Sequence, residues 1–251
     1  MVEPIYEIRG LCKSYGSRPV LADLDFDVLR GESLVVLGRS GSGKSVMLRQ
    51  LNGLEKPDRG SIEFDGEEIS HLRERDLYPL RRRVAMLFQG GALFDSMTVA
   101  ENVAFPLREH TDLDDGEIVN AVREKLAKVG LRDIDSKLPS DLSGGMKKRV
   151  ALARSMALDP EVVLFDEPTT GLDPMTSATI GNLIRTTQRD LQATAVVVTH
   201  DIALARLVGD RIAFLDEGKF SFVGSWEEAD RVSDPLLAGF LAGREESEDG
   251  A

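Results

Sequence analysis

Short apolar runs recur along the chain, and each ends at a glycine-rich or polar stretch. The run Leu34–Leu37 precedes a glycine-rich turn and a helical pattern over residues 44–52, which predicts a buried parallel strand that leads into a helix. Polar residues also follow three further runs, at Val84–Phe88, Val162–Phe165 and Ala195–Val198. Because such sheets bind ligands beyond the carboxyl ends of their strands, we predict an α/β fold with a ligand site at that edge.

Different patterns flank this core. Tyr6–Leu11 and Leu24–Leu29 are short β-type segments between turn residues, which predicts an antiparallel β flap. Between residues 89 and 160 there is no apolar strand run. There, the helical spacing of Asp114–Val129 and Ser143–Leu158 predicts two helices, the second opened by a serine that can cap it.

These patterns predict a single domain over residues 1–241. Its parts are a core of residues 1–89 and 160–224, an inserted α-helical subdomain of residues 90–159, and a C-terminal helical extension of residues 225–241. The acidic end of the chain, residues 242–251, has little to bury and predicts a disordered tail. A length of 251 residues with 42% apolar residues is sufficient for one such core.

Composition narrows the possible functions. The formal net charge is −12, the pI is about 4.8, and the basic residues form no stripe, so nucleic acid is not an expected partner. A single cysteine, Cys12, excludes an intrachain disulfide and a multi-cysteine metal site, as expected in a reducing cytoplasm. No apolar run approaches the roughly 20 residues that span a bilayer, so we expect that the chain does not cross a membrane itself.

The glycine-rich turn fits the P-loop pattern G-x-x-x-x-G-K-S at residues 38–45. Its glycines allow backbone N–H groups to surround phosphate oxygens at a helix N-terminus, where the helix dipole favours anions. Lys44 is expected to contact the β- and γ-phosphates, and Ser45 to ligate Mg²⁺. The candidate nucleotide-binding residues of this loop are Gly38, Ser40, Gly41, Gly43, Lys44 and Ser45.

Two acidic residues end the apolar run at residues 162–165. A carboxylate at the end of a buried strand beside a P-loop can hold Mg²⁺, which makes Asp166 a metal ligand candidate. Glu167 is expected to point elsewhere, and to orient and deprotonate the attacking water. A strand that merely ends in a turn with two acidic residues is the alternative for this segment taken alone.

A second anion-binding motif separates this chain from other P-loop proteins. Ser143, Gly144 and Gly145 open a predicted helix, and a helix N-terminus of this composition suits phosphate. One chain is expected to hold one triphosphate at its P-loop, so we expect the second motif to serve a neighbouring chain. A GTPase or small-molecule kinase gives this motif no role, and the chain has no Asn-Lys-x-Asp guanine-reading motif.

Together these motifs resemble the ATP-binding subunits of ABC transporters, over about residues 5–225. The resemblance implies a P-loop NTPase (RecA-like) fold, ATP with Mg²⁺, and a head-to-tail homodimer that holds two ATP molecules. Each ATP would lie between the P-loop of one subunit and residues 143–145 of the other. It further implies integral-membrane permease subunits, through which the chain would lie peripherally on the cytoplasmic face of the inner (plasma) membrane.

The resemblance assigns roles to four more residues. Tyr15 matches the aromatic residue that stacks on adenine, and Asp173 matches the loop that crosses the dimer. Gln89 matches the residue that contacts the metal and the attacking water, and His200 matches the γ-phosphate switch histidine. Taken singly, each also has an ordinary explanation: a turn aromatic, a turn former, a strand cap, and a residue at a helix start.

Two departures from the family pattern bear on the transporter that is served. Met146 stands where glutamine is common, and Asp95-Ser96 stand where many members have a proline. The segments Leu142–Arg149 and Leu87–His110 resemble ATPases of Mla-type, MCE-associated lipid transporters. This resemblance implies lipid, most of all phospholipid, as cargo and an MCE-domain lipid-binding protein as partner. The alternatives are the ATPase of an amino-acid or other small-solute importer, or an ABC ATPase without a transport function.

Overall fold

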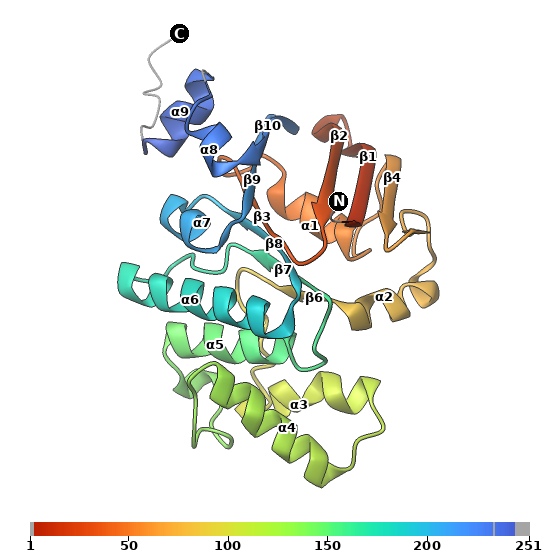
Figure 1. The fold of residues 1–251 in the computed structure, drawn as a ribbon. Coiled ribbons are helices and arrows are strands. Elements are labelled where there is room, and N and C mark those ends of the chain that lie inside the picture. The colour runs from red at the N-terminus through yellow and green to blue at the C-terminus, as the bar shows by residue number, and fades with distance from the viewer. Residues whose placement is uncertain (1–2, 233, 244–251) are drawn as a thin grey trace.

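The computed structural model describes residues 3–232 and 234–243 (Figure 1). Its larger sheet consists of β3 (Ser33–Leu37), β6 (Val84–Leu87), β7 (Val162–Asp166), β8 (Thr194–Thr199), β9 (Arg211–Asp216) and β10 (Lys219–Ser225). The strand order is β10-β9-β3-β8-β7-β6, and all neighbours pair in parallel except β10, which is antiparallel to β9. The predicted parallel core is therefore confirmed, and β9, β10 and their connections were not predicted.

The antiparallel flap is also confirmed. It consists of β1 (Pro4–Tyr15), β2 (Arg18–Leu29), β4 (Arg59–Phe64) and β5 (Glu67–Glu68), in the order β2-β1-β4-β5. Strands β1 and β2 are longer than the sequence pattern predicted, because register shifts let the ladder continue through irregular positions. Residues 16–17 form the turn between them.

Two hydrophobic layers enclose the larger sheet, which explains why its central strands are apolar throughout. Along β3, Val35 and Leu37 face one layer, and Leu34 and Val36 face the other, as the two-residue period of a strand requires. The first layer contains apolar residues of the helices that follow residue 98. The second contains the inner side of the flap together with apolar residues of the helices at 44–51 and 78–83. Every residue of β3, β7 and β8 is buried.

The described helices are α1 (Lys44–Leu51), α2 (Tyr78–Arg83), α3 (Val99–His110), α4 (Asp115–Lys128), α5 (Gly144–Ser155), α6 (Pro174–Leu191), α7 (Ile202–Val208), α8 (Trp226–Ala229) and α9 (Pro235–Leu241). Single 3₁₀ turns occur at Glu74–Asp76 and Pro139–Asp141. Among these helices none is both long and apolar enough to cross a membrane. In Figure 1, α3 and α4 lie at the opposite end of the molecule from the flap, with α5 and α6 between them and the sheet.

The segment between β6 and β7 is helical, as predicted, but it contains α3 in addition to the two predicted helices. Helix α3 begins with a capping box of Thr98 and Glu101 and continues through Pro106, a residue that usually ends a helix. Asp114 and Ser143 cap α4 and α5, so both predicted helices begin where the sequence indicated. The C-terminal segment forms α8 and α9; residues 244–251 of the predicted tail lie outside the described residues.

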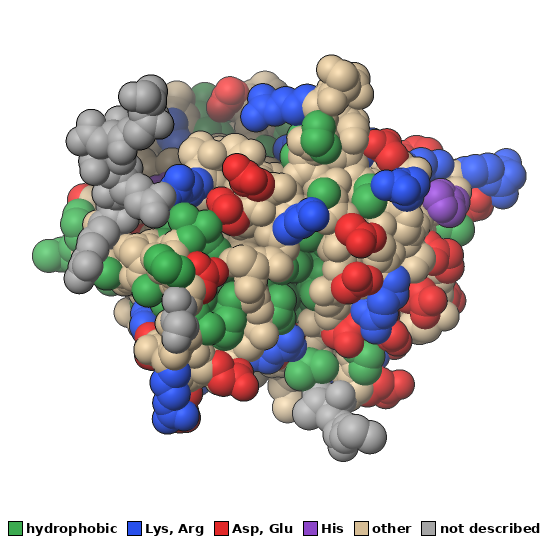
Figure 2. All heavy atoms as spheres, turned by 90° about the horizontal axis from the view of Figure 1, so that it is seen from above, with side chains coloured by type: hydrophobic (Ala, Val, Ile, Leu, Met, Phe, Trp, Pro, Cys, Tyr) green, Lys and Arg blue, Asp and Glu red, His purple; other side chains and the backbone are tan. Residues whose placement is uncertain are grey.

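Charge is distributed without strong segregation on the face that Figure 2 shows. Acidic and basic side chains are interspersed there, and the visible basic side chains do not merge into one patch.

Candidate nucleotide-binding site

The loop between β3 and α1 follows the course that the P-loop motif predicts. Gly43 has φ of 106°, and a Cβ there would lie 2.8 Å from Leu21 Cδ2 and 2.9 Å from the Val20 carbonyl oxygen. A Cβ on Gly38 would lie 2.3 Å from the carbonyl oxygen of Leu215. Glycine is therefore required at both positions, since the loop is pressed against backbone on two sides.

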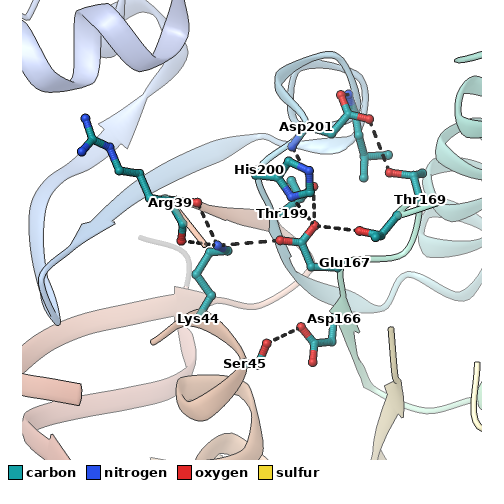
Figure 3. A network of polar contacts seen from close by, with 12 residues as sticks. Arg39, Lys44, Ser45, Asp166, Glu167, Thr169, Thr199, His200 and Asp201 are labelled. Atoms are coloured by element: carbon teal, nitrogen blue, oxygen red, sulfur yellow. Dashed lines mark hydrogen bonds and ion pairs between the residues drawn. The ribbon is translucent and has the colours of Figure 1, made fainter. Parts of the chain in front are cut away.

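Lys44 is held at the centre of this loop. Its side chain is only 6% exposed, and Nζ donates to the carbonyl oxygens of Gly38 (2.8 Å) and Arg39 (2.9 Å) and lies 3.7 Å from Glu167 Oε1. Burial lowers the pKa of Lys44, and the charge of Glu167 opposes this shift. Figure 3 shows the ammonium group between the loop carbonyls and the glutamate. A charged phosphate oxygen is a stronger acceptor than a neutral carbonyl oxygen, so a bound phosphate can replace the loop carbonyls as partner of Lys44.

Two side chains whose oxygen atoms can bind a metal lie close together near this lysine. Ser45 Oγ donates to Asp166 Oδ1 at 2.7 Å, although the two residues are 121 positions apart. Burial raises the pKa of Asp166, and the hydrogen bond from Ser45 and the charge of Lys44 counteract it. A hydroxyl and a carboxylate so close together suit Mg²⁺, which prefers hard oxygen ligands and completes its shell with phosphates and water. Two of the three residues predicted to contact the metal, Ser45 and Asp166, are thus adjacent, and the third, Gln89, lines the cavity that opens over the loop.

Glu167 points away from Asp166, as predicted, because the chain turns sharply between them. Its φ is 47°, a left-handed conformation that is rare outside glycine, and its N–H donates to the Val198 carbonyl. Its Oε2 lies 2.9 Å from His200 Nδ1 and accepts hydrogen bonds from Thr199 Oγ1 (3.4 Å) and Thr170 Oγ1 (3.3 Å). Figure 3 shows the carboxylate enclosed by these groups and Lys44. The two threonines were not predicted.

A cavity of about 1150 Å³ opens over the loop. The predicted residues on its wall are Ser40, Gly41, Gly43, Lys44, Ser45, Gln89, Glu167 and His200. Its apolar wall was not predicted, and comes from Val20, Ile202 and residues of α9 such as Leu236 and Phe240. The volume is sufficient for a ligand of nucleotide size, which supports the predicted role of the loop.

Tyr15 is not brought to this cavity. It lies at the end of β1 with 48% of its surface exposed, and its hydroxyl donates to Glu55. This hydrogen bond raises the pKa of Tyr15. The role of Tyr15 against adenine therefore remains a prediction.

Ser143, Gly144 and Gly145 line a second, separate cavity of about 400 Å³, together with Asp173. Ser143 Oγ accepts a hydrogen bond from the Met146 N–H at 3.3 Å, so it caps α5, and the first backbone N–H groups of a helix have no acceptor within it. Asp173 caps α6. No residue lines both cavities. Within one chain the second motif is therefore apart from the P-loop, as expected if it serves a neighbour.

Sequence comparison decides the family. A profile described as ABC transporter matches residues 21–170, which include the P-loop, residues 143–145 and both acidic residues.

The chain belongs to the ABC transporter family.

Close relatives agree along nearly the full chain. The probable ribonucleotide transport ATP-binding protein mkl of Mycobacterium leprae is 44% identical over 95% of this chain and 69% of its own length. For the Mycobacterium tuberculosis protein of the same name the chain spans 66% of the relative's length. The intermembrane phospholipid transport system ATP-binding protein MlaF of Haemophilus influenzae is 39% identical over 97% of this chain and 92% of its own length.

Solved structures confirm the fold. The post-hydrolysis dimer of the ATP-binding cassette MJ0796, bound to ADP and Pi, superposes with a TM-score of 0.82 at 32% identity, covering 88% of this chain and 98% of that chain. The predicted P-loop NTPase fold with a β flap and a helical region is thus correct. As an ABC ATPase, the chain binds ATP and hydrolyses it.

Proposed function

We propose that the chain is the motor of a transporter that moves phospholipid between membranes. The observation that carries this proposal is the similarity to MlaF, which extends over 92% of that protein and therefore includes the helical region and the C-terminal helices. The mkl relative carries a ribonucleotide transport name, but the chain spans only 69% of it. The amino-acid importer considered from the sequence gains no support from MlaF.

The motor works as a homodimer with ATP between the subunits. Two observations support this arrangement: the P-loop cavity and the cavity at residues 143–145 are separate within one chain, and the cassette MJ0796 is a dimer. The N–H groups at the start of α5 would contact the γ-phosphate bound to the partner's P-loop. Asp173, on the same cavity, would lie at the subunit boundary.

The polar side chains predicted to act in hydrolysis each have a task at or beside the P-loop cavity. Lys44 exchanges its loop carbonyls for phosphate oxygens and neutralises charge there. Glu167 accepts the proton of the attacking water, while His200, 2.9 Å away, fixes the carboxylate. Gln89 lines the same cavity and orients the water together with them. Ser45 and Asp166, together with Gln89, would hold Mg²⁺, which would supply positive charge to neutralise the phosphates.

Permease subunits of the membrane would contact the α3 side of the molecule. Exposed aromatic residues gather there: Phe94 and Phe105 have ring centroids 5.0 Å apart, and the Tyr78 hydroxyl donates to the Glu109 carbonyl. Exposed apolar clusters of this kind are typical of protein interfaces. The chain would then lie peripherally on the cytoplasmic face of the inner membrane, with an MCE-domain protein as the lipid-binding component.

The test is identification of what accompanies the chain. The tagged protein is purified from detergent-solubilised membranes and its companions are identified by mass spectrometry. We expect a multi-spanning permease and an MCE-domain protein, and MgATP-dependent movement of labelled phospholipid in proteoliposomes made from the complex. A periplasmic solute-binding protein in place of the MCE-domain protein would contradict the lipid proposal. The Lys44→Ala complex is the control for ATP dependence.

A further inference from the structure

Lys148 is a buried cation that the mechanism above does not use. It lies in α5, five residues after Ser143, and is only 8% exposed. Its Nζ donates to the backbone carbonyl oxygen of Gln89. Burial lowers the pKa of Lys148, while the charges of Asp166 and Glu167 act in the opposite direction. A buried ammonium is costly unless it is hydrogen-bonded, so this contact indicates a specific requirement.

A second cation of α5 holds the same segment. Arg154 Nη2 donates to the Gly91 carbonyl oxygen at 3.0 Å, and its guanidinium lies 5.4 Å from the ring centroid of Phe94. Gly91 has φ of 77°, and a Cβ there would lie 3.3 Å from the Cβ of Ala151. Residues 148, 151 and 154 recur at three-residue spacing, so one face of α5 supports residues 89–91 along its length.

Helix α5 therefore lines the second cavity and contacts a residue that lines the P-loop cavity. Its N-terminus, at residues 143–145, lines the second cavity, and Lys148 holds the backbone of a residue that lines the P-loop cavity. At 1.5 Å per residue, only about 7.5 Å of helix separates Ser143 from Lys148. A helix is rigid over that length, so a displacement of its N-terminus is passed to Gln89.

We propose that Lys148 is a positioning residue for Gln89, and that through it the occupancy of one ATP site sets the geometry of the other. The positioning of Gln89 by Lys148 involves one chain only. The coupling between the sites rests on the homodimer proposed above, in which residues 143–145 contact the partner's ATP. Loss of the ammonium frees the backbone of residue 89, and the Gln89 side chain no longer holds the attacking water in line.

The test compares Lys148→Met with a matched control in the complex purified from membranes. Methionine preserves the length of the buried side chain and removes the hydrogen-bond donor. The control, Lys147→Met, removes the neighbouring ammonium group, whose side chain makes no hydrogen bond or ion pair among the described residues. For Lys148→Met we expect kcat to fall about tenfold to a hundredfold, with KM for ATP changed less than about threefold, because a misplaced group affects the chemical step. Lys147→Met keeps both constants.

A double-mutant cycle separates positioning from a structural role. In a Gln89→Ala background the side chain to be positioned is gone, so Lys148→Met should lower kcat no further. Additive losses in the cycle, or a wild-type kcat for Lys148→Met, would overturn the positioning role. If the losses in kcat are additive and Lys148→Met also lowers Tm as much as a core truncation such as Leu152→Ala does, the role of Lys148 is to stabilise the fold.

Coupling between the sites is measured by the Hill coefficient for ATP. We expect the value of the wild type, above 1, to fall toward 1 in Lys148→Met and to be kept in Lys147→Met. A Hill coefficient unchanged by Lys148→Met would refute the coupling. If positions 40 and 143 of different subunits do not come into contact, the proposed homodimer is wrong. The double-mutant cycle would still decide whether Lys148 positions Gln89.

Discussion

Replacement of Glu167 by glutamine removes one negative charge from the P-loop cavity and keeps the shape of the side chain. Glutamine can still accept the hydrogen bonds of Thr170 and Thr199 and can occupy the same backbone conformation at φ of 47°. The fold should therefore be unaffected. What is lost is the proton acceptor beside His200 and the partner of Lys44.

The magnitude follows from the geometry. Glu167 Oε1 lies 3.7 Å from Lys44 Nζ, and charges at that separation interact by about 4.5 kcal/mol at an effective dielectric constant of 20. A γ-phosphate near Lys44 meets repulsion of similar order from the carboxylate, reduced by the water between them. We expect Glu167→Gln to bind ATP about tenfold more tightly, and to lose about 10²- to 10⁴-fold in hydrolysis rate, the usual contribution of a general base.

The assay combines binding with assembly. ATP affinity is measured by titration with a fluorescent ATP analogue, single-turnover hydrolysis with labelled ATP, and dimerisation by size exclusion with and without MgATP. We expect tight binding, trapped ATP and a dimer that persists only with nucleotide. Asp166→Asn is the control, since it also removes a carboxylate but weakens the metal site. A Glu167→Gln variant that stays monomeric and hydrolyses ATP at the wild-type rate would refute the assignment of the base.

Two further substitutions test the loop and the metal site. Lys44→Ala should weaken ATP binding at least about tenfold in the same titration, because the phosphates lose a buried charge-assisted partner, and unchanged affinity would contradict the role of Lys44. Asp166→Asn should raise the Tm of the metal-free chain at neutral pH. Because the pKa of Asp166 is raised, its carboxyl group binds a proton more tightly in the folded chain than in the unfolded chain. The free energy of unfolding of the wild type therefore falls as pH rises and Asp166 ionises. The rise in Tm caused by Asp166→Asn should shrink toward acid pH, where the wild-type carboxyl is also neutral. A rise in Tm that grows toward acid pH would show that folding lowers the pKa of Asp166.

The core of the site could be predicted from sequence because its parts are local. A buried strand, a glycine-rich turn and a helix over residues 34–52 specify a phosphate-binding loop within one short segment. Asp166 and Glu167 end an apolar run, so strand geometry places them at the carboxyl edge of the sheet, the same edge from which that loop leaves. The capping role of Ser143 also depends only on near neighbours.

Features that depend on distant contacts could not be predicted. Lys148 belongs to a run of three basic residues that is typical of solvent-exposed segments, and only the folded structure shows that its side chain is buried and donates to the Gln89 carbonyl. Helix α3 was missed because Pro106 indicates a break, yet packing of Val103 and Leu107 holds the helix together. The wall that α9 adds to the cavity requires the chain to fold back from its C-terminal end.

The central claim, that each ATP lies between the P-loop of one chain and residues 143–145 of another, is tested most directly by crosslinking. Chains with Ser40→Cys and chains with Ser143→Cys are given different tags and mixed, with Cys12→Ser and Glu167→Gln in both to remove the native thiol and retain ATP. The account predicts a disulfide-linked heterodimer that forms with MgATP and is absent without nucleotide. If no such species forms, while a chain carrying both cysteines crosslinks only within itself, the claim is wrong.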